Sequence, residues 1–424
     1  MSDLTRRRLL GTTLAGAGIL AATRGAAAAP AQPAELFGSV EGGKIAFPPI
    51  HNASEVEGQP PNPDAPARRL GIAVVGLGRL SLENILPGIG QSKSVRLAGL
   101  VSGHRDKALA VADQYGLGHE HVYDYAGYDR IAGDAGIDAV YVVVPNALHE
   151  EYVVRAAAAR KHVLCEKPMA ASPAQCERMI AACRRANVKL MVAYRMQYEP
   201  ANRTLVELVR AKRYGDVRFI EAVNGQNDAP DRQWRQIRAL SGGGSLPDVG
   251  LYCLNAFRFI TGEEPLEVTG RVTRPANDPR FAEVEDVCQF TLRFPSGIVA
   301  TGSSGYSFHE SRRLRVHAAA GWLDLDPAFS YDNVTLHLGA KAGDANAVDT
   351  RRFTQRSQFA TEMDAFVDAV RANRTPHTPG EEGLQDHRIM AAIYASAADG
   401  GRAVRLPVIT GIDTMRGPLP PASP

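Results

Sequence analysis

Two segments far apart in the chain carry side chains that could move a proton. The first is Cys165-Glu166-Lys167-Pro168-Met169, where an expected strand ends and places Lys167 at the carboxyl edge of a sheet. The second is a glycine-rich stretch leading into an expected helix with Asp248 and Tyr252, four residues apart and so on one face. A tyrosine is a weak base at its free pKa of about 10, and a neighbouring ammonium favours its phenolate. We therefore expect Lys167, Tyr252 and Asp248 to form a catalytic group.

Each of these side chains also has a structural interpretation. Taken separately, Lys167 and Asp248 suit a protein surface, and Tyr252 suits the packing of a helix. The catalytic interpretation is favoured because both segments occur together with a turn that is typical of nucleotide binding.

That turn is Gly76-Leu77-Gly78-Arg79-Leu80-Ser81, which follows the apolar run Leu70–Val75 and precedes a helical segment. A Gly-x-Gly after a buried strand permits a tight turn, and it lets backbone N–H groups approach a pyrophosphate at a helix N-terminus. Ser81 stands where the strict fingerprint has a third glycine. The position of the motif between strand and helix predicts a dinucleotide site.

The end of the second expected strand predicts which dinucleotide binds. Folds that bind NAD place an acidic residue there, at the ribose hydroxyls. This chain has Ser102 in that place, with Arg105 and Lys107 just beyond it. A hydroxyl with nearby cations suits a 2′-phosphate, because charge-assisted hydrogen bonds are the strong ones. Asp106 argues the other way, unless it faces solvent on the helix. The sequence favours NADP over NAD.

The elements that must position these residues alternate between strand and helix up to about residue 193. Continuous apolar runs are typical of strands buried on both faces, and strands alternating with helices indicate βαβ units. The expected strands are Leu70–Val75, Val95–Val101, Ala139–Val144, His162–Cys165 and Leu190–Ala193, and the helical patterns between them are Arg105–Tyr115, Leu148–Ala159 and Pro173–Asn187. We predict an α/β fold with a Rossmann-type, doubly wound parallel sheet over residues 68–193.

After about residue 200, strand candidates follow one another closely. They are Val217–Val223, Leu266–Val272, Cys288–Phe294 and Ile298–Gly302, with helices near Gln358–Arg371 and Glu382–Ala398. We predict an α+β domain with a large open, mostly antiparallel sheet over residues 194–406, followed by a tail at 407–424. Residues 339–356 match no pattern.

The N-terminal segment has the features of an export signal. A basic start at Thr5-Arg6-Arg7-Arg8-Leu9-Leu10 precedes a Gly/Ala-rich apolar stretch and Ala26–Ala29, which predicts a twin-arginine signal over residues 1–29. The alternative, a short membrane anchor, is disfavoured because the segment is too short and glycine-rich to cross a bilayer. The proline-rich residues 30–67 are either a linker or an arm that wraps a neighbouring subunit. We expect a periplasmic protein, the twin-arginine machinery as a partner, and no stable membrane insertion.

Charge and cysteine content exclude other classes. The formal net charge is +2, which argues against nucleic acid as a partner. The chain has five cysteines, an odd number, and no Cys-x-x-Cys motif. We therefore expect buried free thiols. No His/Cys cluster has zinc spacing, and we predict no metal.

The motifs together resemble the Gfo/Idh/MocA family of oxidoreductases. The resemblance rests on Gly76-Leu-Gly78, Pro145-Asn146-Ala-Leu-His149, Glu166-Lys167-Pro168 and Asp248-Val-Gly-Leu-Tyr252, and it runs from about Leu70 to Leu406. Many family members have histidine in place of Tyr252. Tyrosine there, with the signal and the proline-rich arm, makes the chain similar to the exported glucose–fructose and aldose–aldose oxidoreductases.

The resemblance implies roles for further residues. It implies tightly held NADP, with Ser102 and Lys107 at the 2′-phosphate and Tyr125 near the adenine. It also implies an open sheet used for homodimer or homotetramer contacts. The cofactor-binding set that we predict is Gly76, Leu77, Gly78, Arg79, Leu80, Ser102, Arg105, Lys107, Tyr125, Pro145, Asn146, His149, Glu166, Lys167, Arg195, Trp234, Arg235 and Tyr331.

The function implied is a ping-pong transfer between sugars. One aldose, such as glucose, is oxidised to its lactone, and a second sugar, such as fructose or another aldose, is reduced to a polyol. An exported enzyme would need such regeneration, because it meets no pool of reduced cofactor. Three alternatives stay open: an exported NAD-dependent glycosidase, an ordinary NADP-dependent sugar dehydrogenase, and a non-catalytic sensor.

Overall fold

Six strands form a parallel sheet near the N-terminal end of the described chain. The computed structural model describes residues 39–41, 44–46, 68–227 and 233–419. The sheet has the order β5-β4-β3-β6-β7-β8, and every pairing in it is parallel. Its strands are β3 (Leu70–Val75), β4 (Val95–Val101), β5 (Val122–Tyr123), β6 (Ala139–Val142), β7 (His162–Cys165) and β8 (Leu190–Val192). The Rossmann-type sheet predicted from the apolar runs is confirmed.

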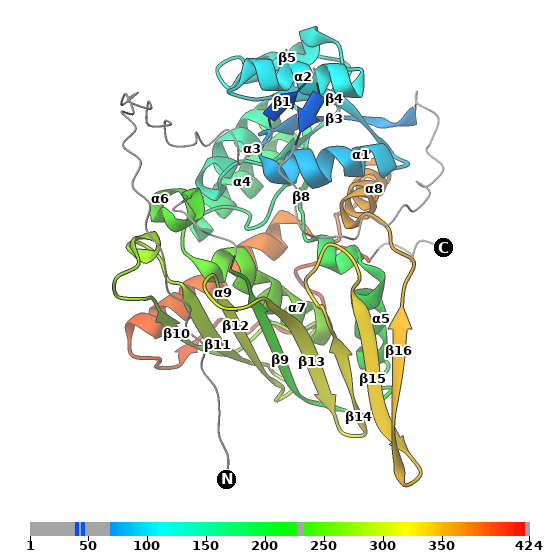
Figure 1. Ribbon diagram of the computed structural model, residues 1–424, viewed down its shortest axis with the longest axis vertical. Coiled ribbons are helices and arrows are strands. Elements are labelled where there is room, and N and C mark those ends of the chain that lie inside the picture. The colour runs from blue at the N-terminus through cyan, green and yellow to red at the C-terminus, as the bar shows by residue number, and fades with distance from the viewer. Residues whose placement is uncertain (1–38, 42–43, 47–67, 228–232, 420–424) are drawn as a thin grey trace, which may run out of the picture.

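Both faces of this sheet are covered, which explains why its strands are mostly apolar. Its helices are α1 (Leu86–Gln91), α2 (Arg105–Tyr115), α3 (His149–Ala158) and α4 (Pro173–Ala186). One apolar cluster joins the sheet to α1, α2 and α8 (Gln358–Arg371), and another lies on the face covered by α3 and α4. Helix α8 thus packs on the first sheet although it comes from the C-terminal part of the chain (Figure 1).

The second sheet is larger and mostly antiparallel. Its order is β16-β15-β14-β13-β9-β12-β11-β10-β17, and only β9 and β12 pair in parallel. Its strands are β9 (Val217–Gly225), β10 (Glu267–Thr273), β11 (Val287–Arg293), β12 (Val299–Gly305), β13 (Ser311–Ala318), β14 (Gly321–Leu325), β15 (Thr335–Ala342), β16 (Ala345–Arg352) and β17 (Val404–Arg405). This confirms the predicted α+β part.

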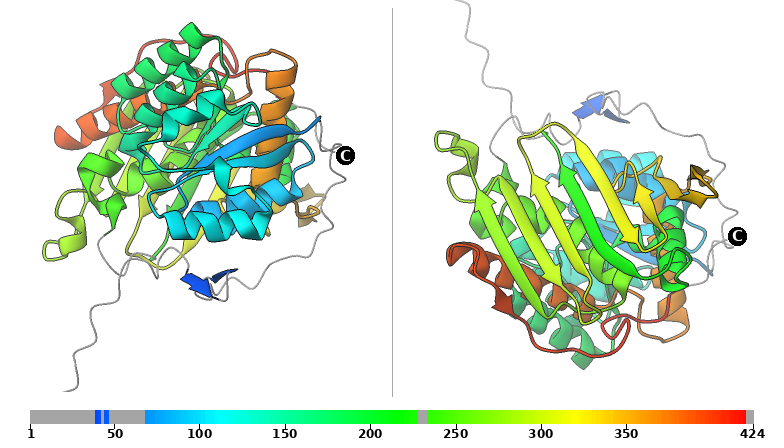
Figure 2. Two further views of the ribbon diagram at one scale, coloured as in Figure 1. Left: turned by 90° about the horizontal axis from the view of Figure 1, so that it is seen from above. Right: turned by 90° about the horizontal axis from the view of Figure 1, so that it is seen from below.

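Helices lie between the two sheets. They are α5 (Pro200–Arg210), α6 (Arg238–Ser241), α7 (Leu251–Thr261) and α9 (Gly380–Ala398). Figure 2 (right) shows that the opposite face of β9 to β13 is left open by the described helices. Apolar residues from α7, α9 and both sheets belong to one continuous cluster, so the two sheets share a core.

Two elements were not expected from the sequence. Residues 339–356, which match no pattern, include β16 and the end of β15, and every residue of β16 is exposed. A short hairpin, β1 (Ser39–Glu41) and β2 (Lys44–Ala46), occurs inside the proline-rich segment and lies next to α2. The predicted signal at 1–29 and the rest of residues 30–67 lie outside the described residues.

Candidate active site

The carboxyl ends of four neighbouring strands carry the predicted cofactor residues. Strand β3 lies between β4 and β6, and β6 lies beside β7. The segments that follow these strands therefore meet at one edge of the sheet, which is where open α/β sheets bind their ligands.

The glycine turn after β3 requires its glycines. Gly76 has a φ of +96°, and a Cβ on it would lie 2.2 Å from the carbonyl oxygen of Val143. A Cβ on Gly78 would meet nothing within 4 Å, so open space lies above this backbone. Ser81 is buried and donates its hydroxyl to the Gly76 carbonyl oxygen at 2.5 Å. The departure from the fingerprint thus supplies a hydrogen bond that fastens the turn.

The other side chains of this turn point in different directions. Leu77 is buried in the core below the sheet, and Leu80 packs partly buried against the same cluster. Arg79 is exposed and forms an ion pair with Glu83 at 2.9 Å.

Two polar side chains, Ser102 and Lys107, follow the end of β4. Ser102 is buried, and its hydroxyl oxygen accepts the backbone N–H of His104 at 3.1 Å. Lys107 donates its ammonium to the Leu77 carbonyl oxygen at 2.8 Å, and burial lowers the pKa of this lysine. The cation thus lies at the glycine turn. The side chain of Arg105 is exposed at the start of α2.

The ring of Tyr125 packs close to Gly103, which follows Ser102. A Cβ on Gly103 would lie 3.3 Å from the Tyr125 ring, which also packs against the Tyr152 ring with centroids 5.4 Å apart. The residues near this strand end therefore fit the adenosine half of a dinucleotide. They supply a glycine turn, the Ser102 hydroxyl, the Lys107 ammonium and the Tyr125 ring.

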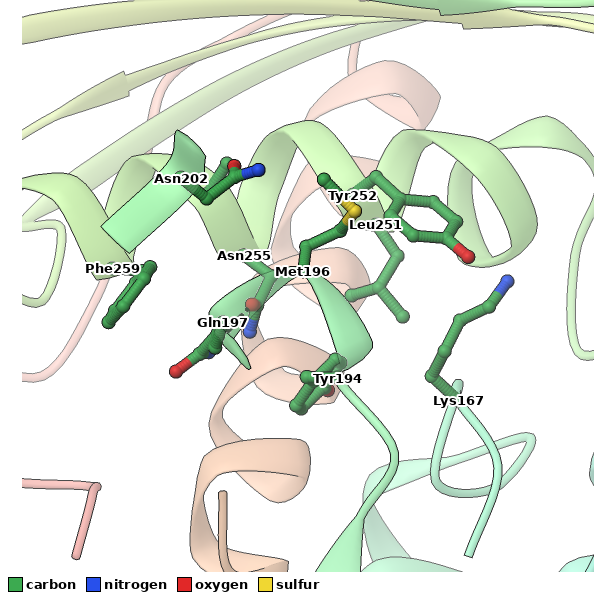
Figure 3. Close-up of a pocket in the computed structure, with 10 residues that line it drawn as sticks. Lys167, Tyr194, Met196, Gln197, Asn202, Leu251, Tyr252, Asn255 and Phe259 are labelled. Carbon is green, nitrogen blue, oxygen red and sulfur yellow. Dashed lines mark hydrogen bonds between the residues drawn. The ribbon is translucent and has the colours of Figure 1, made fainter. Parts of the chain in front are cut away.

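Lys167, Asp248 and Tyr252 come together as the sequence predicts. The Lys167 ammonium donates to the Asp248 backbone carbonyl at 2.9 Å and to its carboxylate Oδ1 at 3.2 Å. It also lies 4.7 Å from the centroid of the Tyr252 ring. Figure 3 shows the ammonium pointing toward the hydroxyl end of Tyr252. A π-helical turn, Leu246–Gly250, precedes α7 and carries Asp248.

The charges of this group are fixed by their neighbours. Burial alone would lower the pKa of Lys167, but the Tyr252 phenol and the Asp248 carboxylate outweigh it and raise this pKa above its usual value. Burial opposes ionisation of Asp248, yet Arg235 and Lys167 hold its pKa well below the usual range. The site therefore presents an ammonium and a carboxylate at neutral pH.

Arg235 and Tyr306 complete the surroundings of the Asp248 carboxylate. Its Oδ2 accepts Arg235 Nε at 3.0 Å and the Tyr306 hydroxyl at 2.7 Å. The Arg235 guanidinium lies 4.5 Å from the centroid of Trp234, so both predicted residues belong to this wall.

Arg195 and Tyr331 also lie close to the Tyr252 ring. The Arg195 guanidinium is 5.0 Å from the centroid of the Tyr252 ring and 4.4 Å from that of Tyr331. Tyr331 is 47% exposed, so it stands at the mouth of the site. Two cations, Lys167 and Arg195, thus lie within 5.0 Å of the Tyr252 ring centroid.

The remaining predicted cofactor residues make mainly protein contacts. Pro145 is half-buried, and the Asn146 amide donates to the Ser241 carbonyl oxygen at 2.8 Å. The His149 ring is 1% exposed and faces the carbonyl oxygens of Val144 and Pro168 at 2.8 and 3.1 Å. It therefore braces the segment that carries Lys167.

Two residues outside the predicted set, Tyr306 and Glu285, hold the segment that precedes α7 in place. Tyr306 follows β12 and contacts Asp248. Glu285 precedes β11, and its carboxylate accepts the backbone N–H groups of Gly244 and Leu246, both at 3.0 Å. No local motif marks either residue, because each acts on a segment about 40 or more residues away.

A pocket lies beside Lys167 and Tyr252, with about 370 Å³ of empty space that includes open solvent. Its lining, much of which Figure 3 labels, is Lys167, Tyr194, Met196, Gln197, Asn202, Leu251, Tyr252, Asn255, Ala256 and Phe259. Most of this lining is apolar. The amides of Gln197, Asn202 and Asn255 lie toward one end, and Lys167 and Tyr252 lie at the other.

Over residues 39–41, 44–46, 68–227 and 233–419, no three or more His, Cys, Asp or Glu side chains are grouped to hold a metal ion. In the same ranges no helix is long and apolar enough to cross a membrane. All five cysteines lie in these ranges, and they are buried and free as expected.

Comparisons with known proteins agree with this geometry. Residues 70–194 match the family described as "Oxidoreductase family, NAD-binding Rossmann fold", and residues 202–324 match the "GFO/IDH/MocA C-terminal domain". The D-xylose 1-dehydrogenase (NADP(+)) of Haloarcula marismortui is 34% identical over 81% of this chain and 94% of its own length. A second D-xylose 1-dehydrogenase (NADP(+)), from Haloferax volcanii, is 31% identical over 78% of this chain and 98% of its own length.

A solved structure is also similar along most of the described chain. The aldose–aldose oxidoreductase from Caulobacter crescentus, complexed with glycerol, is 42% identical and covers 80% of this chain and 100% of its own, with a TM-score of 0.76. The two family matches together span more than half of the chain, in the order of the two sheets. The chain is therefore an oxidoreductase that belongs to the Gfo/Idh/MocA family.

Proposed function

We propose that the protein is an NADP-containing sugar oxidoreductase that transfers hydride from one sugar to another in a ping-pong cycle. The observation that carries the proposal is the contact of Lys167 with both Asp248 and the Tyr252 ring at the edge of a dinucleotide-binding sheet. Relatives and a structural neighbour that act on xylose and on aldoses support the substrate class.

NADP fits the residues at this edge. The open space above Gly78 leaves room for a pyrophosphate, and Ser102 and Lys107 present a hydroxyl and a cation beside it. Because Ser102 carries no charge, it leaves the 2′-phosphate without the repulsion that an acidic residue would exert. When bound there, NADP would accept hydride from one sugar carbon and return it to another.

The residues of the chain divide the rest of the work. Tyr252 takes the proton of the sugar hydroxyl at the carbon that is oxidised, and it returns this proton when the second sugar is reduced. Lys167 and Arg195 stabilise negative charge as the phenolic proton leaves, since both cations lie within 5.0 Å of the ring centroid. Asp248, held by Arg235 and Tyr306, accepts hydrogen bonds from other sugar hydroxyls and orients the ring.

Loss of either proton-moving residue should remove most turnover. We expect Tyr252→Phe and Lys167→Ala to lower kcat by at least about 100-fold, the usual effect of losing a positioned acid–base group. NADP should remain bound, because the adenosine-side residues are untouched. Stopped-flow measurement of cofactor absorbance with glucose gives the rate. Near-wild-type kcat in both variants would refute the assignment.

Release of the cofactor tests its identity and its tight binding. The protein purified without added nucleotide is denatured, and the supernatant is analysed by chromatography and mass spectrometry. We expect NADP or NADPH close to one per chain. NAD in its place would favour the glycosidase alternative, for which hydrolysis of a chromogenic glycoside is the direct assay. An empty protein would contradict tight binding.

An ordinary NADP-dependent dehydrogenase is the second candidate, and the xylose dehydrogenase relatives favour it. The two functions differ in what happens after the first half-reaction. A ping-pong enzyme given glucose and fructose without added nucleotide forms lactone and polyol in equal amounts over many turnovers. A dehydrogenase stops after one turnover per chain until free NADP is supplied.

Export and assembly are part of the same proposal. The Arg6-Arg7-Arg8 segment supports twin-arginine export to the periplasm. Replacement of these arginines by lysine should leave the protein in the cytoplasm on cell fractionation. The open face of the second sheet supports a homodimer or homotetramer, which light scattering of the purified protein would distinguish.

A further inference from the structure

A buried pair of carboxyl groups lies behind the catalytic residues and has no part in the mechanism above. Glu166 follows β7 and directly precedes Lys167, whereas Glu362 belongs to α8. The hydroxyl of Tyr141, in the middle of β6, lies between them, 2.9 Å from Glu166 Oε1 and 3.0 Å from Glu362 Oε1. Tyr141 and Glu362 are 0% exposed, and Glu166 is 6% exposed.

The number of protons in this bridge is fixed by its geometry. A phenol hydroxyl carries a single hydrogen, and an ionised carboxylate can only accept. Tyr141 can therefore donate to one of the two carboxyl groups, and its contact with the other requires that group to donate. One of the two carboxyl groups must hold a proton. Two adjacent buried carboxylates would also repel each other strongly.

The surroundings of the two groups decide which one is protonated. Burial raises the pKa of Glu166, but the charge of Lys167 opposes this rise, and Glu166 Oε2 accepts the Lys167 backbone N–H at 3.1 Å. Glu362 Oε2 is buried and has no hydrogen-bond partner among the described residues. Burial and the charge of Glu166 raise the pKa of Glu362 well above its usual value. The proton therefore belongs on Glu362.

A proton on Glu362 matters because of Arg195. This guanidinium is 4% exposed, and within the described residues it binds neutral groups: the carbonyl oxygens of Ser330 and Phe329 at 3.0 and 2.8 Å, the side-chain oxygen of Gln358, and the sulfur of Met196. No carboxylate in that part of the chain forms an ion pair with it. Its charge is thus left to act on Tyr252 and Tyr331.

The groups that face Glu362 come from three elements. They are Glu166 after β7, Tyr141 of β6, and Arg195 and Tyr198 from the helical turn Arg195–Tyr198. Arg195 is the single cation among them. Ionisation of Glu362 would therefore oppose the charge that Arg195 presents to Tyr252.

We propose that Glu362 works as a neutral carboxylic acid, bridged through Tyr141 to Glu166, and that its proton preserves the positive charge of Arg195 at Tyr252. Glu362 acts through Arg195 and does not contact the substrate. Its kinetic consequence rests on the proposed function, whereas its protonation state can be measured without any sugar.

Infrared spectroscopy tests the protonation state directly. We expect a carboxylic-acid C=O stretch in the wild-type protein at pH 7.5 that disappears in Glu362→Gln, whose amide can still donate to Tyr141. Asp364→Asn is the matched control on the same helix, because the Asp364 carboxylate already accepts the Ser92 hydroxyl at 2.5 Å and the Ser94 N–H at 3.0 Å. The band should remain in that variant. A difference spectrum without a lost band in Glu362→Gln would overturn the proposal.

The pH profile tests the consequence for the reaction. We expect kcat/KM of the wild type to fall about tenfold at alkaline pH as Glu362 ionises, which corresponds to about 1.4 kcal/mol at the transition state. Glu362→Gln should retain the rate at pH 7.5 and lose this part of the alkaline limb, while Asp364→Asn keeps it. An unchanged alkaline limb in Glu362→Gln would contradict the role in catalysis. Loss of turnover in the wild type itself would instead refute the proposed function, while the infrared result would stand.

Discussion

The Asp248 carboxylate accepts hydrogen bonds from three side chains of the site. Lys167, Arg235 and Tyr306 all donate to it, which leaves its carboxylate oriented but already well satisfied. In the proposed function a sugar hydroxyl would join this set without displacing it. The direction of the carboxylate would then matter more for sugar binding than its charge, which its cations keep negative at neutral pH.

The Tyr306 hydroxyl is the neutral member of that set and the one that can be removed without changing charge. We expect Tyr306→Phe to lower kcat/KM about tenfold, because a hydrogen bond to a charged group contributes about 1.5–3 kcal/mol. The loss should appear mainly in KM, since Lys167 and Tyr252 keep their contact. Tyr214→Phe, which removes the hydroxyl of a tyrosine whose ring packs near Gly321 of the second sheet, is the control. Equal kcat/KM in both variants would argue against this role.

The prediction of Lys167 and Tyr252 as catalytic residues was possible because a motif surrounds each of them. Glu166 was noticed for the same reason. Its partners Tyr141 and Glu362 were not, because a tyrosine inside an apolar strand and a glutamate inside an amphipathic helix have no local signal. The bridge between them joins residues 221 positions apart in the chain. Only the packing of α8 on the first sheet brings them together.

At the scale of elements, the boundaries of the parallel strands follow directly from the sequence. The runs Leu70–Val75, Val95–Val101 and His162–Cys165 are strands with those bounds, because strands buried on both faces are mostly apolar, although Val95–Val101 includes Arg96. Strands β13 to β16 carry a weaker signal. Their alternation is mixed with charged residues on an open face, and β16 buries nothing at all. Such strands depend on their pairing partners, which a single sequence does not reveal.

Helix α9 contributes a buried histidine whose protonation should limit stability in acid. His387 Nε2 accepts the Ala170 N–H at 3.2 Å, which requires an unprotonated nitrogen, and burial lowers the pKa of His387 to about 3. The unfolded chain binds this proton below about pH 6.5, and the folded chain does not. The contribution of His387 to the free energy of unfolding should thus be fully present above about pH 6.5. It should fall by about 1.4 kcal/mol per pH unit as the pH drops toward 3.

Urea unfolding between pH 7.5 and 5 measures this effect. His387→Gln should flatten the pH dependence, because the amide oxygen can accept the same N–H without titrating. His119→Gln, with a side chain 53% exposed in the wild type, is the matched control and should leave the slope unchanged. An equally steep slope in His387→Gln would mean that another group titrates in this range.

At the scale of the whole molecule, the C-terminal segment closes the core. Arg416 has a fully buried side chain that donates to Glu382 at 2.8 Å. Glu382 also faces the buried Arg258, which pairs with Glu264 and Asp386 at 2.7 and 2.5 Å. The same carboxylate accepts Gln197 at 3.0 Å, and Gln197 lines the pocket beside Tyr252. Arg416 is thus linked through Glu382 and Gln197 to the pocket beside Tyr252.

Removal of one cation from this network should be costly. We expect Arg416→Met to lower the free energy of unfolding by about 3–5 kcal/mol, since it leaves a buried carboxylate with fewer partners. Arg402→Met is the control, because its ion pair with Asp399 is exposed and should contribute about 0–1 kcal/mol. Chemical denaturation of both variants gives the comparison. Similar losses in the two variants would contradict the importance of burial.

The position of Arg416 also has a consequence for the order of folding. Domains of a growing chain usually fold from the N-terminal end as they are synthesised. Here α8 completes the core of the first sheet, and Arg416 reaches the shared core only at the end of the chain. A nascent chain that lacks these residues leaves Glu382 without one of its cations. The folded core is therefore complete only in a chain that extends through α8 to Arg416.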